Sequence, residues 1–244
     1  MSLRVGVDVG GTFTDLVVVD AGSGDVRSRK VLTTPDAPAR GVLEGLVALS
    51  PGGAAAVLHG TTIVTNAVVE GKGARTALVT TRGFRDVLEI ARQNRVDLYR
   101  LDTAPRPAPL VARHRRFEVT ERVAGDGRVV TPLAEAELSA LVVAIRETGA
   151  EAVAICLLHA YAHPEHEARL GAILGATFPY LSVSHEINAE FREYERTATT
   201  VLNAAVMPVA DRYLADLETS LARAGFTGPL HLLQSSGAMM SAEA

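Results

Sequence analysis

A short glycine-rich stretch near the amino terminus carries the residues best suited to chemistry. It reads Gly6-Val7-Asp8-Val9-Gly10-Gly11-Thr12-Phe13-Thr14-Asp15 and lies between two apolar segments. Gly10 and Gly11 have no Cβ, so the backbone can adopt positive φ and its N–H groups can approach an anion closely. Thr12 and Thr14 would add hydroxyl donors. The stretch therefore predicts a phosphate-binding loop.

Asp8 ends the segment before this loop, where a carboxylate would repel phosphate unless a divalent cation lay between them. ATP with Mg²⁺ is therefore the predicted ligand, with Asp8 as metal ligand and Asp15 as a second carboxylate. The predicted catalytic residues are Asp8 and Asp15, and the predicted nucleotide-binding residues are Gly10, Gly11, Thr12, Phe13 and Thr14. The alternative is a β-hairpin with a Gly-Gly turn and no ligand.

Two other phosphate-binding motifs are excluded. The sequence contains no G-x-x-x-x-G-K-[ST] motif, and Arg27 replaces the third glycine that a dinucleotide motif starting at Gly22 would need.

The overall composition is that of a globular protein. The chain has 244 residues, of which 48% are hydrophobic and 21% charged, and a net charge of -4 at pH 7. This charge argues against nucleic acid as a partner, although residues 113–116 are locally basic. Its single cysteine excludes an internal disulfide. No apolar run is long enough for a signal peptide or a membrane span, so we predict a cytoplasmic protein without a membrane partner.

The residues that flank the loop predict a three-stranded antiparallel meander, formed by segments that begin at Leu3, Phe13 and Val26. A helix over about 39–49 follows, then a buried strand at 56–58, a helix and a strand at 76–80, which we interpret as a β-α-β unit with parallel strands. Residues 103–113 predict an extended connector. The pattern predicts an α/β fold with a mixed sheet.

The second half of the chain predicts further elements of both kinds. Residues 117–123 and 128–130 predict a surface hairpin, and Thr131 with Pro132 predicts the start of a helix that ends at Gly149. A strand at 152–158, a helix after Pro164 and a strand at 181–184 predict another β-α-β unit. A long helix should run from about 190 to 224, and Pro208 should end or kink it. A last strand is predicted at 230–233.

The junction His59-Gly60-Thr61-Thr62, which leads to Asn66, is the second candidate site. A strand that turns into a helix here exposes backbone N–H groups, which a ligand or the threonine hydroxyls could satisfy. Capping of the helix by threonine is the alternative, and the residues alone favour it.

Other polar residues have weaker claims to a site. Glu89 and Arg92 are one helical turn apart, and the residues alone favour an exposed salt bridge over a substrate role. Cys156 lies in an apolar segment and is predicted to be a core residue. His159, His163 and His166 could gather a metal ion, but helix-start polarity explains them equally well. Residues 193–204 predict either a capping and salt-bridge cluster or a helix face turned toward a cleft.

The glycine-rich stretch resembles the first phosphate loop of the sugar-kinase, actin and heat-shock-ATPase superfamily. Together with the blocks at 59–101, 190–206 and 232–243, it is similar to the hydantoinase A/5-oxoprolinase family, which includes acetone carboxylase subunits. The resemblance implies an actin-like ATPase (ribonuclease H-like) fold in an incomplete copy, since no second Asp-x-Gly-Gly-Thr occurs. It divides the chain into an amino-terminal domain at 1–188 and the start of a following domain at 189–244.

The resemblance also implies a function. The full protein would be an ATP-dependent enzyme that activates a lactam or hydantoin by phosphoryl transfer before ring opening, with a hydantoinase B-type subunit or domain as partner, and this chain alone would be inactive. The alternatives are a subunit of an acetone-type carboxylase and a non-catalytic nucleotide-binding regulatory module. Residues with an implied substrate role are His59, Gly60, Thr61, Thr62, Asn66 and Arg92.

Overall fold

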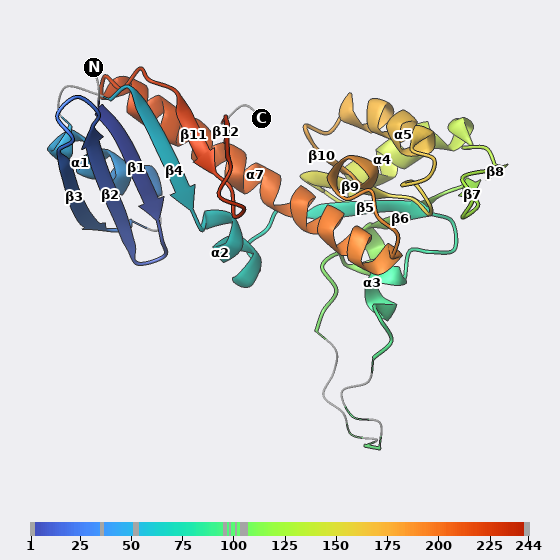
Figure 1. Ribbon diagram of the computed structural model, residues 1–244. Helices are drawn as coiled ribbons and strands as arrows, with labels where there is room; N and C mark the ends of the chain where they lie inside the picture. Colours follow the sequence, from blue (N-terminus) through green and yellow to red (C-terminus); the bar gives the residue numbers. More distant parts are fainter. Residues whose placement is uncertain are drawn as a thin grey trace. The chain divides into compact units, whose positions relative to one another are not determined.

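The computed structural model describes residues 3–34, 37–50, 54–94, 97, 99–100, 102 and 107–241 (Figure 1). The chain forms two compact units, one made of Met1–Lys72 with Val209–Ala244 and the other of Gly73–Pro208. Each unit is described by itself below. The boundary between residues 188 and 189 was predicted from the family resemblance and does not coincide with the division into compact units. It stays a prediction. Residues 103–106 of the predicted connector lie outside the described residues.

The first unit begins with an antiparallel meander of β1 (Leu3–Val9), β2 (Phe13–Asp20) and β3 (Val26–Leu32). The three-stranded meander predicted from the sequence is confirmed. In β1 the odd-numbered valines are buried and the even-numbered residues lie on the opposite face, as strand geometry requires.

The meander is extended by strands from distant parts of the chain. After α1 (Pro38–Leu49), β4 (Ala56–Thr61) pairs with β1 in parallel. Next to β4 lie β11 (Leu230–Leu233), which is parallel to it, and β12 (Met239–Ser241), which is antiparallel to β11. The resulting mixed sheet has the order β12-β11-β4-β1-β2-β3, and α2 (Ile63–Val69) follows β4.

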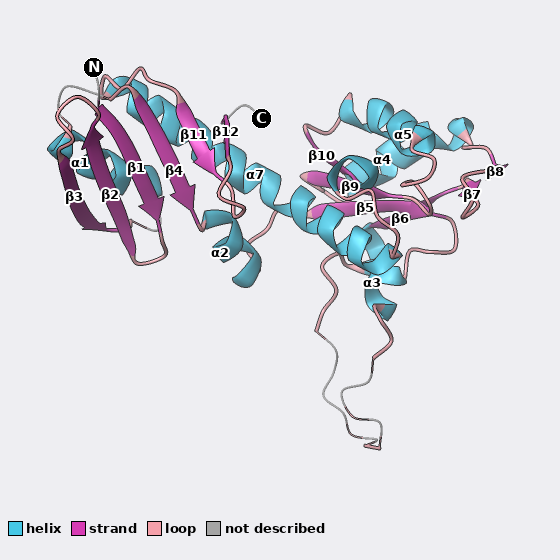
Figure 2. Cartoon of the chain, in the orientation of Figure 1, coloured by secondary structure: helices cyan, strands magenta, loops and turns pink. Residues whose placement is uncertain are grey.

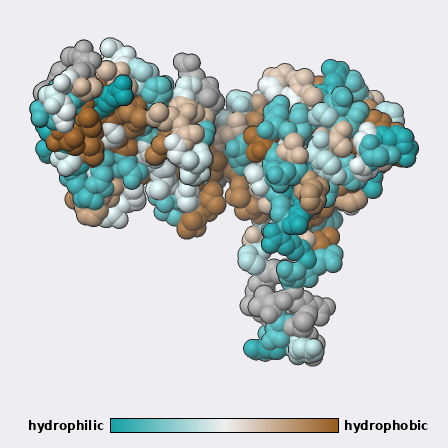
Figure 3. Space-filling model, in the orientation of Figure 1, coloured by the Kyte–Doolittle hydropathy of each residue, from teal (hydrophilic) through white to brown (hydrophobic). Residues whose placement is uncertain are grey.

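Helices cover one face of this sheet. The core on that face joins the inward residues of β1 and β2, such as Val5 and Leu16, to Val42 and Leu46 of α1 and to Leu217 of the last long helix. No helix among the described residues covers the opposite face of the meander (Figure 1), and Figure 3 shows apolar side chains gathered on that face. The exposed apolar residues on this face of β2 and β3 include Val17, Val19 and Val26.

The predicted β-α-β unit from β4 through α2 to the next strand is wrong. That strand, β5 (Thr76–Thr81), belongs to the second unit and pairs with two strands there. The place beside β4 is taken by β11, more than 150 residues later in the chain. An apolar strand is compatible with either sheet, so its residue types do not reveal which neighbour it will take.

The second unit is built on a four-stranded parallel sheet with the order β10-β9-β5-β6 (Figure 2). Its other strands are β6 (Arg116–Val119), β9 (Ala152–Cys156) and β10 (Tyr180–Val183). One face packs against α4 (Leu138–Glu147) and α5 (Glu165–Gly175). The other face packs against α3 (Val87–Ile90) and the first half of α7 (Glu193–Arg223). The β-α-β unit made by β9, α5 and β10 confirms the second one predicted.

Two predicted elements of this unit need correction. The predicted strand at 117–123 is divided into β6, which joins the parallel sheet, and β7 (Arg122–Val123), which pairs with β8 (Val129–Thr131) in a small hairpin. Thr120 and Glu121 separate the two strands. The buried Glu121 carboxylate forms hydrogen bonds with the side chains of Thr81 and His166. Because Thr131 completes β8, the following helix α4 starts at Leu138, after a 3₁₀ turn at Glu135–Glu137.

Pro208 lies inside α7 and does not end it. A proline removes the one hydrogen bond that its own N–H would have donated. The turns before it are held by buried Val201 and Ala204 in the second unit, and those after it by buried Tyr213 and Leu217 in the first. Packing on both sides of Pro208 therefore sustains the helix. The short helix α6 (Ser184–Ile187) precedes α7, and no helix within the described ranges is long and apolar enough to cross a membrane.

Candidate functional site

The Gly10-Gly11 loop closes the β1–β2 hairpin of the first unit. Gly10 donates its N–H to the carbonyl of Phe13 at 3.0 Å, and within the described residues the N–H groups of Gly11 and Thr12 donate to no acceptor. Neither glycine has a positive φ, contrary to the conformation that we expected. Close approach explains Gly10 instead, because a Cβ there would lie 3.2 Å from the Phe13 carbonyl oxygen. The loop thus presents two unpaired backbone donors.

Thr14 supports this loop from the covered side of the sheet. Its side chain is fully buried, and its hydroxyl lies 3.0 Å from that of Thr33, which in turn donates to the Gly10 carbonyl at 2.9 Å. Thr12 and Phe13 are exposed. The structure therefore places Thr12 at the loop surface, whereas the Thr14 hydroxyl is engaged inside the protein.

Asp8 and Asp15 are direct cross-strand neighbours at the end of the sheet, on its uncovered face. Asp8 is exposed, and Asp15 accepts a hydrogen bond from Lys30 at 2.9 Å. On its other side Asp8 faces Gly60 of β4, which has no side chain to crowd it. The two predicted carboxylates are thus brought together beside the loop.

A pocket of about 290 Å³ lies on the other side of the loop, toward the helices. Gly10, Gly11, Asn66 and Lys72 contribute to its lining. The Asn66 amide nitrogen lies 3.5 Å from where a Cβ on Gly11 would be, and Lys72 forms a 2.6 Å ion pair with Glu70. Asn66 was predicted as a site residue, but Lys72 was missed because a single lysine in a Gly-Lys-Gly turn gives no specific signal.

The His59–Thr62 junction takes a different form from the one expected. β4 extends through Thr61, whose hydroxyl accepts a 3.2 Å hydrogen bond from the N–H of Ile63. Thr62 occupies the cap position of α2 without capping it, and its hydroxyl donates to the Val9 carbonyl at 3.3 Å. This bond ties the start of α2 to the strand that carries the loop.

The His59 side chain is buried on the helix-covered face of β4 and shares a 2.8 Å hydrogen bond with the Tyr213 hydroxyl. Burial lowers the pKa of His59 to about 4, so the imidazole is neutral near pH 7. The substrate role predicted for His59 stays a prediction, and in this position its imidazole contacts the protein interior.

Arg92 belongs to the second unit, and its predicted salt bridge with Glu89 is wrong. Arg92 pairs instead with Glu195 at the start of α7, and the neighbouring Arg92 guanidinium lowers the pKa of Glu195. Glu89 pairs with Arg116 at 3.0 Å. The helix α3 ends at Ile90, so Arg92 lies outside it and is not one helical turn from Glu89.

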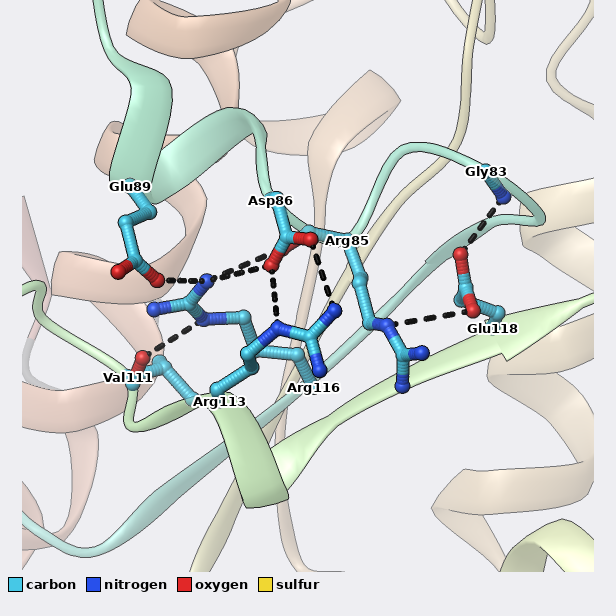
Figure 4. A network of polar contacts seen from close by, with 8 residues as sticks. All are labelled: Gly83, Arg85, Asp86, Glu89, Val111, Arg113, Arg116 and Glu118. Atoms are coloured by element: carbon cyan, nitrogen blue, oxygen red, sulfur yellow. Dashed lines mark hydrogen bonds and ion pairs between the residues drawn. The ribbon is translucent and has the colours of Figure 1, made fainter.

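The partner of Glu89, Arg116, is the centre of a polar network around α3 (Figure 4). Its side chain is fully buried, and it donates to the carbonyl of Val111 at 2.8 Å and to Asp86 at 3.2 Å. Arg113 forms a two-pronged pair with the same Asp86 carboxylate and lowers its pKa. The network fixes α3 against β6.

Cys156 is a buried core residue, as predicted, and burial raises the pKa of its thiol. Each of the three candidate histidines has a protein partner: His159 the Val123 carbonyl, His163 Glu165, and His166 the buried Glu121. The described residues include no group of three or more acidic, histidine or cysteine side chains that could hold a metal ion.

Residues 193–204 were predicted to form either a capping and salt-bridge cluster or a helix face turned toward a cleft. The first turns of α7 contain ion pairs of Glu195 with Arg92 and of Glu193 with Arg196. Arg196 is fully buried and donates to the Leu157 carbonyl at 2.8 Å and to the Ser184 hydroxyl at 3.2 Å. Thr197 donates to the Cys156 sulfur. These bonds attach α7 to the carboxyl end of β9.

Sequence comparison identifies the family. Residues 4–178 match the hydantoinase/oxoprolinase N-terminal region, and residues 196–244 match the hydantoinase/oxoprolinase family. The chain belongs to the hydantoinase/oxoprolinase family. The resemblance to the hydantoinase A/5-oxoprolinase family found from the sequence is therefore confirmed.

Relatives of this hydantoinase/oxoprolinase chain include proteins with solved structures. An uncharacterized protein of Methanocaldococcus jannaschii is 40% identical, over 97% of this chain and 36% of that protein. The ATP-dependent caprolactamase from Pseudomonas jessenii is 33% identical with a TM-score of 0.86, over 98% of this chain and 36% of the other. The nucleotide-free acetone carboxylase is 27% identical with a TM-score of 0.82, over 99% and 37%. This chain thus spans little more than a third of each of them.

Proposed function

We propose that this chain is the amino-terminal part of an ATP-dependent enzyme that phosphorylates a cyclic amide and so prepares it for ring opening. The observation that carries this proposal is the hairpin loop of the first unit. It offers the unpaired N–H groups of Gly11 and Thr12 next to the exposed carboxylate of Asp8. Membership of the hydantoinase/oxoprolinase family and the likeness to an ATP-dependent caprolactamase support the same reaction class.

The proposed fold of the first unit is that of an actin-like ATPase half. The sheet order supports it: an antiparallel meander whose first strand is followed by two parallel strands, β4 and β11. The loop after β1 and the carboxyl end of β4 lie at the same end of the sheet, because parallel strands place their carboxyl ends together. A nucleotide phosphate at this edge would meet both.

In the proposed site the loop binds the phosphate groups. Phosphoryl transfer depends on positioning and charge stabilisation more than on covalent chemistry by the protein. The N–H groups of Gly11 and Thr12 would donate to phosphate oxygens, and the Thr12 hydroxyl could add a third donor. Gly10 holds the loop through its bond to Phe13, and Thr14 holds it through Thr33.

Asp8 and Asp15 fit a Mg²⁺ ion bound together with a nucleotide. Magnesium in such sites uses one or two carboxylates and completes its shell with water and phosphate oxygens, and these two carboxylates are cross-strand neighbours beside the loop. Asp15 would have to share its carboxylate with Lys30. When bound, the ion would neutralise charge on the transferring phosphoryl group.

The chemistry needs activation because the carbonyl of an unstrained lactam is a poor electrophile. The lactam oxygen forms a bond to the γ-phosphorus of ATP, and the bond from that phosphorus to the bridging oxygen breaks, releasing ADP. Water then adds to the activated carbon, the ring C–N bond breaks, and a second water releases phosphate from the resulting acyl phosphate. We assign the first step to this chain and the hydrolytic steps to a hydantoinase B-type subunit or domain.

Calorimetric titration of ATP with Mg²⁺ into the full-length protein tests the nucleotide site. Asp8→Asn should weaken magnesium-dependent ATP binding at least about tenfold, since a carboxylate ligand is lost. Asp25→Asn is the matched control, because Asp25 is an exposed aspartate in the turn between β2 and β3. Unchanged affinity in Asp8→Asn, or no ATP binding by the full-length protein, would reject the proposed site.

A carboxylase of the acetone type is the second candidate function, favoured by the likeness to acetone carboxylase. It would use the same loop to phosphorylate a ketone enolate or a carboxylate. ATP consumption by the full assembly with a ketone and bicarbonate, but not with lactams, would favour it. ATP binding without consumption of ATP under either condition would favour a regulatory module.

A further inference from the structure

The Gly10-Gly11 loop of the first unit is an open hairpin turn. In a closed turn of this length the carbonyl of Gly10 would accept a hydrogen bond from the N–H of Phe13. Among the residues that the structure describes this bond is absent, although the Gly10 N–H donates to the Phe13 carbonyl at 3.0 Å. The carbonyl of the Gly10–Gly11 peptide is therefore not held from within the turn.

Thr33, the first residue after β3, supplies the missing restraint. Its hydroxyl donates to the Gly10 carbonyl at 2.9 Å, and its N–H donates to the Thr12 carbonyl at 2.9 Å. A hydroxyl carries a single proton, so Thr14, whose hydroxyl lies 3.0 Å from that of Thr33, is the donor in that pair. Thr33 thus holds the peptide before Gly11 and the peptide after Thr12.

The direction of the Gly10 carbonyl decides what the loop offers to a ligand. The described peptide bonds are all trans, so the carbonyl of Gly10 and the N–H of Gly11 point in opposite directions from one peptide plane. Because the carbonyl is turned to the Thr33 hydroxyl, the Gly11 N–H points away from Thr33. An anion meets a donor in this orientation, and it would meet a carbonyl oxygen if the peptide were turned over.

Two consecutive glycines allow this peptide to turn over. The reversal changes ψ of Gly10 and φ of Gly11, and it would bring φ of Gly11 from its present negative value to a positive one. Glycine adopts positive φ about as readily as negative φ, whereas residues with a Cβ rarely do so. The glycine pair therefore permits two peptide orientations, and only one of them suits phosphate.

We propose that Thr33 is a positioning residue that selects the phosphate-binding orientation of the Gly10–Gly11 peptide. This inference rests on the proposed function, because the loop is the proposed phosphate site. Thr33 acts on the phosphate through the Gly10 carbonyl and not by direct contact. Reversal of the peptide would take this carbonyl away from the Thr33 hydroxyl, so the hydrogen bond favours the orientation in which the Gly11 N–H is available.

Calorimetric titration of ATP with Mg²⁺ into the full-length protein measures this selection. Thr33→Val removes the hydroxyl at nearly constant volume, and Thr33→Ser keeps it. Thr148→Val is the matched control, because the half-buried Thr148 hydroxyl donates to the Ile145 carbonyl at 2.7 Å in the second unit. We expect Thr33→Val to weaken ATP binding about fivefold, and Thr33→Ser and Thr148→Val to bind ATP as the wild type does.

A second background separates selection of the peptide orientation from a general loss of structure. Gly11→Ala disfavours positive φ at position 11, and the added Cβ would lie 3.5 Å from the Asn66 amide nitrogen, which is an ordinary contact. In this background the peptide keeps its present orientation whether or not residue 33 carries a hydroxyl. Adding Thr33→Val to Gly11→Ala should therefore weaken ATP binding less than about twofold.

Crystal structures of the full-length wild type and of Thr33→Val show the peptide directly. We expect the Gly10 carbonyl to face Thr33 in the wild type and to be reversed, or present in both orientations, in Thr33→Val. An unchanged carbonyl in Thr33→Val would overturn the proposal. Where the wild type binds ATP, equal affinity in Thr33→Val, or an equal loss in both backgrounds, would also overturn it. If the wild type binds no ATP, the proposed function fails, and the direction of the carbonyl in the two structures still decides the role of Thr33.

Discussion

Asp8 and Gly60 are direct neighbours on the parallel strands β1 and β4, and the Oδ1 atom of Asp8 lies 3.2 Å from the position that a Cβ on Gly60 would take. Glycine at position 60 therefore leaves the space in which the Asp8 carboxylate stands. Asp15 lies on the other side of Asp8. Asp15, Asp8 and Gly60 therefore lie side by side on three neighbouring strands, at the carboxyl end of β1 and next to the Gly10-Gly11 loop.

Gly60→Ala should reduce magnesium-dependent ATP affinity about tenfold in the full-length protein, because the new methyl group displaces the Asp8 carboxylate. The contact is with the end of a side chain, so the free energy of unfolding should change by less than about 1 kcal/mol. Calorimetry and urea denaturation measure the two effects. Gly6→Ala is the control, since the nearest atom to its added Cβ is 4.0 Å away. Equal ATP affinity in both variants would show that Gly60 does not make room for a ligating carboxylate.

Ala91→Gly should raise the free energy of unfolding by about 1 kcal/mol, because glycine adopts φ 52° without the steric cost that alanine bears. Urea denaturation monitored by circular dichroism measures the change. Ala168→Gly, in the exposed face of α5, should have the opposite effect and lower stability by about 1 kcal/mol. Destabilisation by Ala91→Gly would contradict the strain that we infer at this position.

The first unit should lose stability as the pH falls from about 6.5 to about 4. The pKa of His59 is lowered to about 4 in the folded chain, so its stabilising contribution is complete above the unfolded value of 6.5 and declines below it. The loss across this range is on the order of 3 kcal/mol. Denaturation of wild type, His59→Asn and the exposed-histidine control His114→Asn at several pH values measures it. A pH dependence that survives in His59→Asn would assign the effect to another group.

Glu167→Ala should destabilise the second unit by about 3–5 kcal/mol, because a fully buried carboxylate is removed from several donors. Glu167 accepts from the N–H of Leu157 at 2.7 Å, from the Ser184 hydroxyl at 2.7 Å, and from both the backbone and the ring of His185. Amide hydrogen exchange at β9 and α5 gives the local change. Glu165→Ala is the control, because Glu165 is exposed on the same helix, and it should lower the free energy of unfolding by less than about 0.5 kcal/mol. Similar destabilisation by both variants would refute the role of the buried carboxylate.

The sequence predicted those parts of the fold and site that depend on neighbouring residues. The meander, α1, β9 and α7 follow from local periodicity, and the glycine-rich loop is recognisable because its residues are consecutive. Local pattern failed at Glu89 and Arg92, whose true partners lie on β6 and α7. At Pro208 the local pattern predicted an end or a kink, and the helix does not end there because packing of the flanking turns outweighs the loss of one hydrogen bond.

The sequence by itself determined the family, the mixed α/β class and the loop with its two carboxylates. Only the tertiary structure decided that β11, and not β5, is the neighbour of β4 in the first sheet. It also decided that Gly60 lies beside Asp8 and that Arg92 pairs with Glu195. The physical reason is the range of the interactions. Strand and helix preferences depend on residues a few positions apart, whereas strand neighbours and ion pairs depend on which distant surfaces bury each other best.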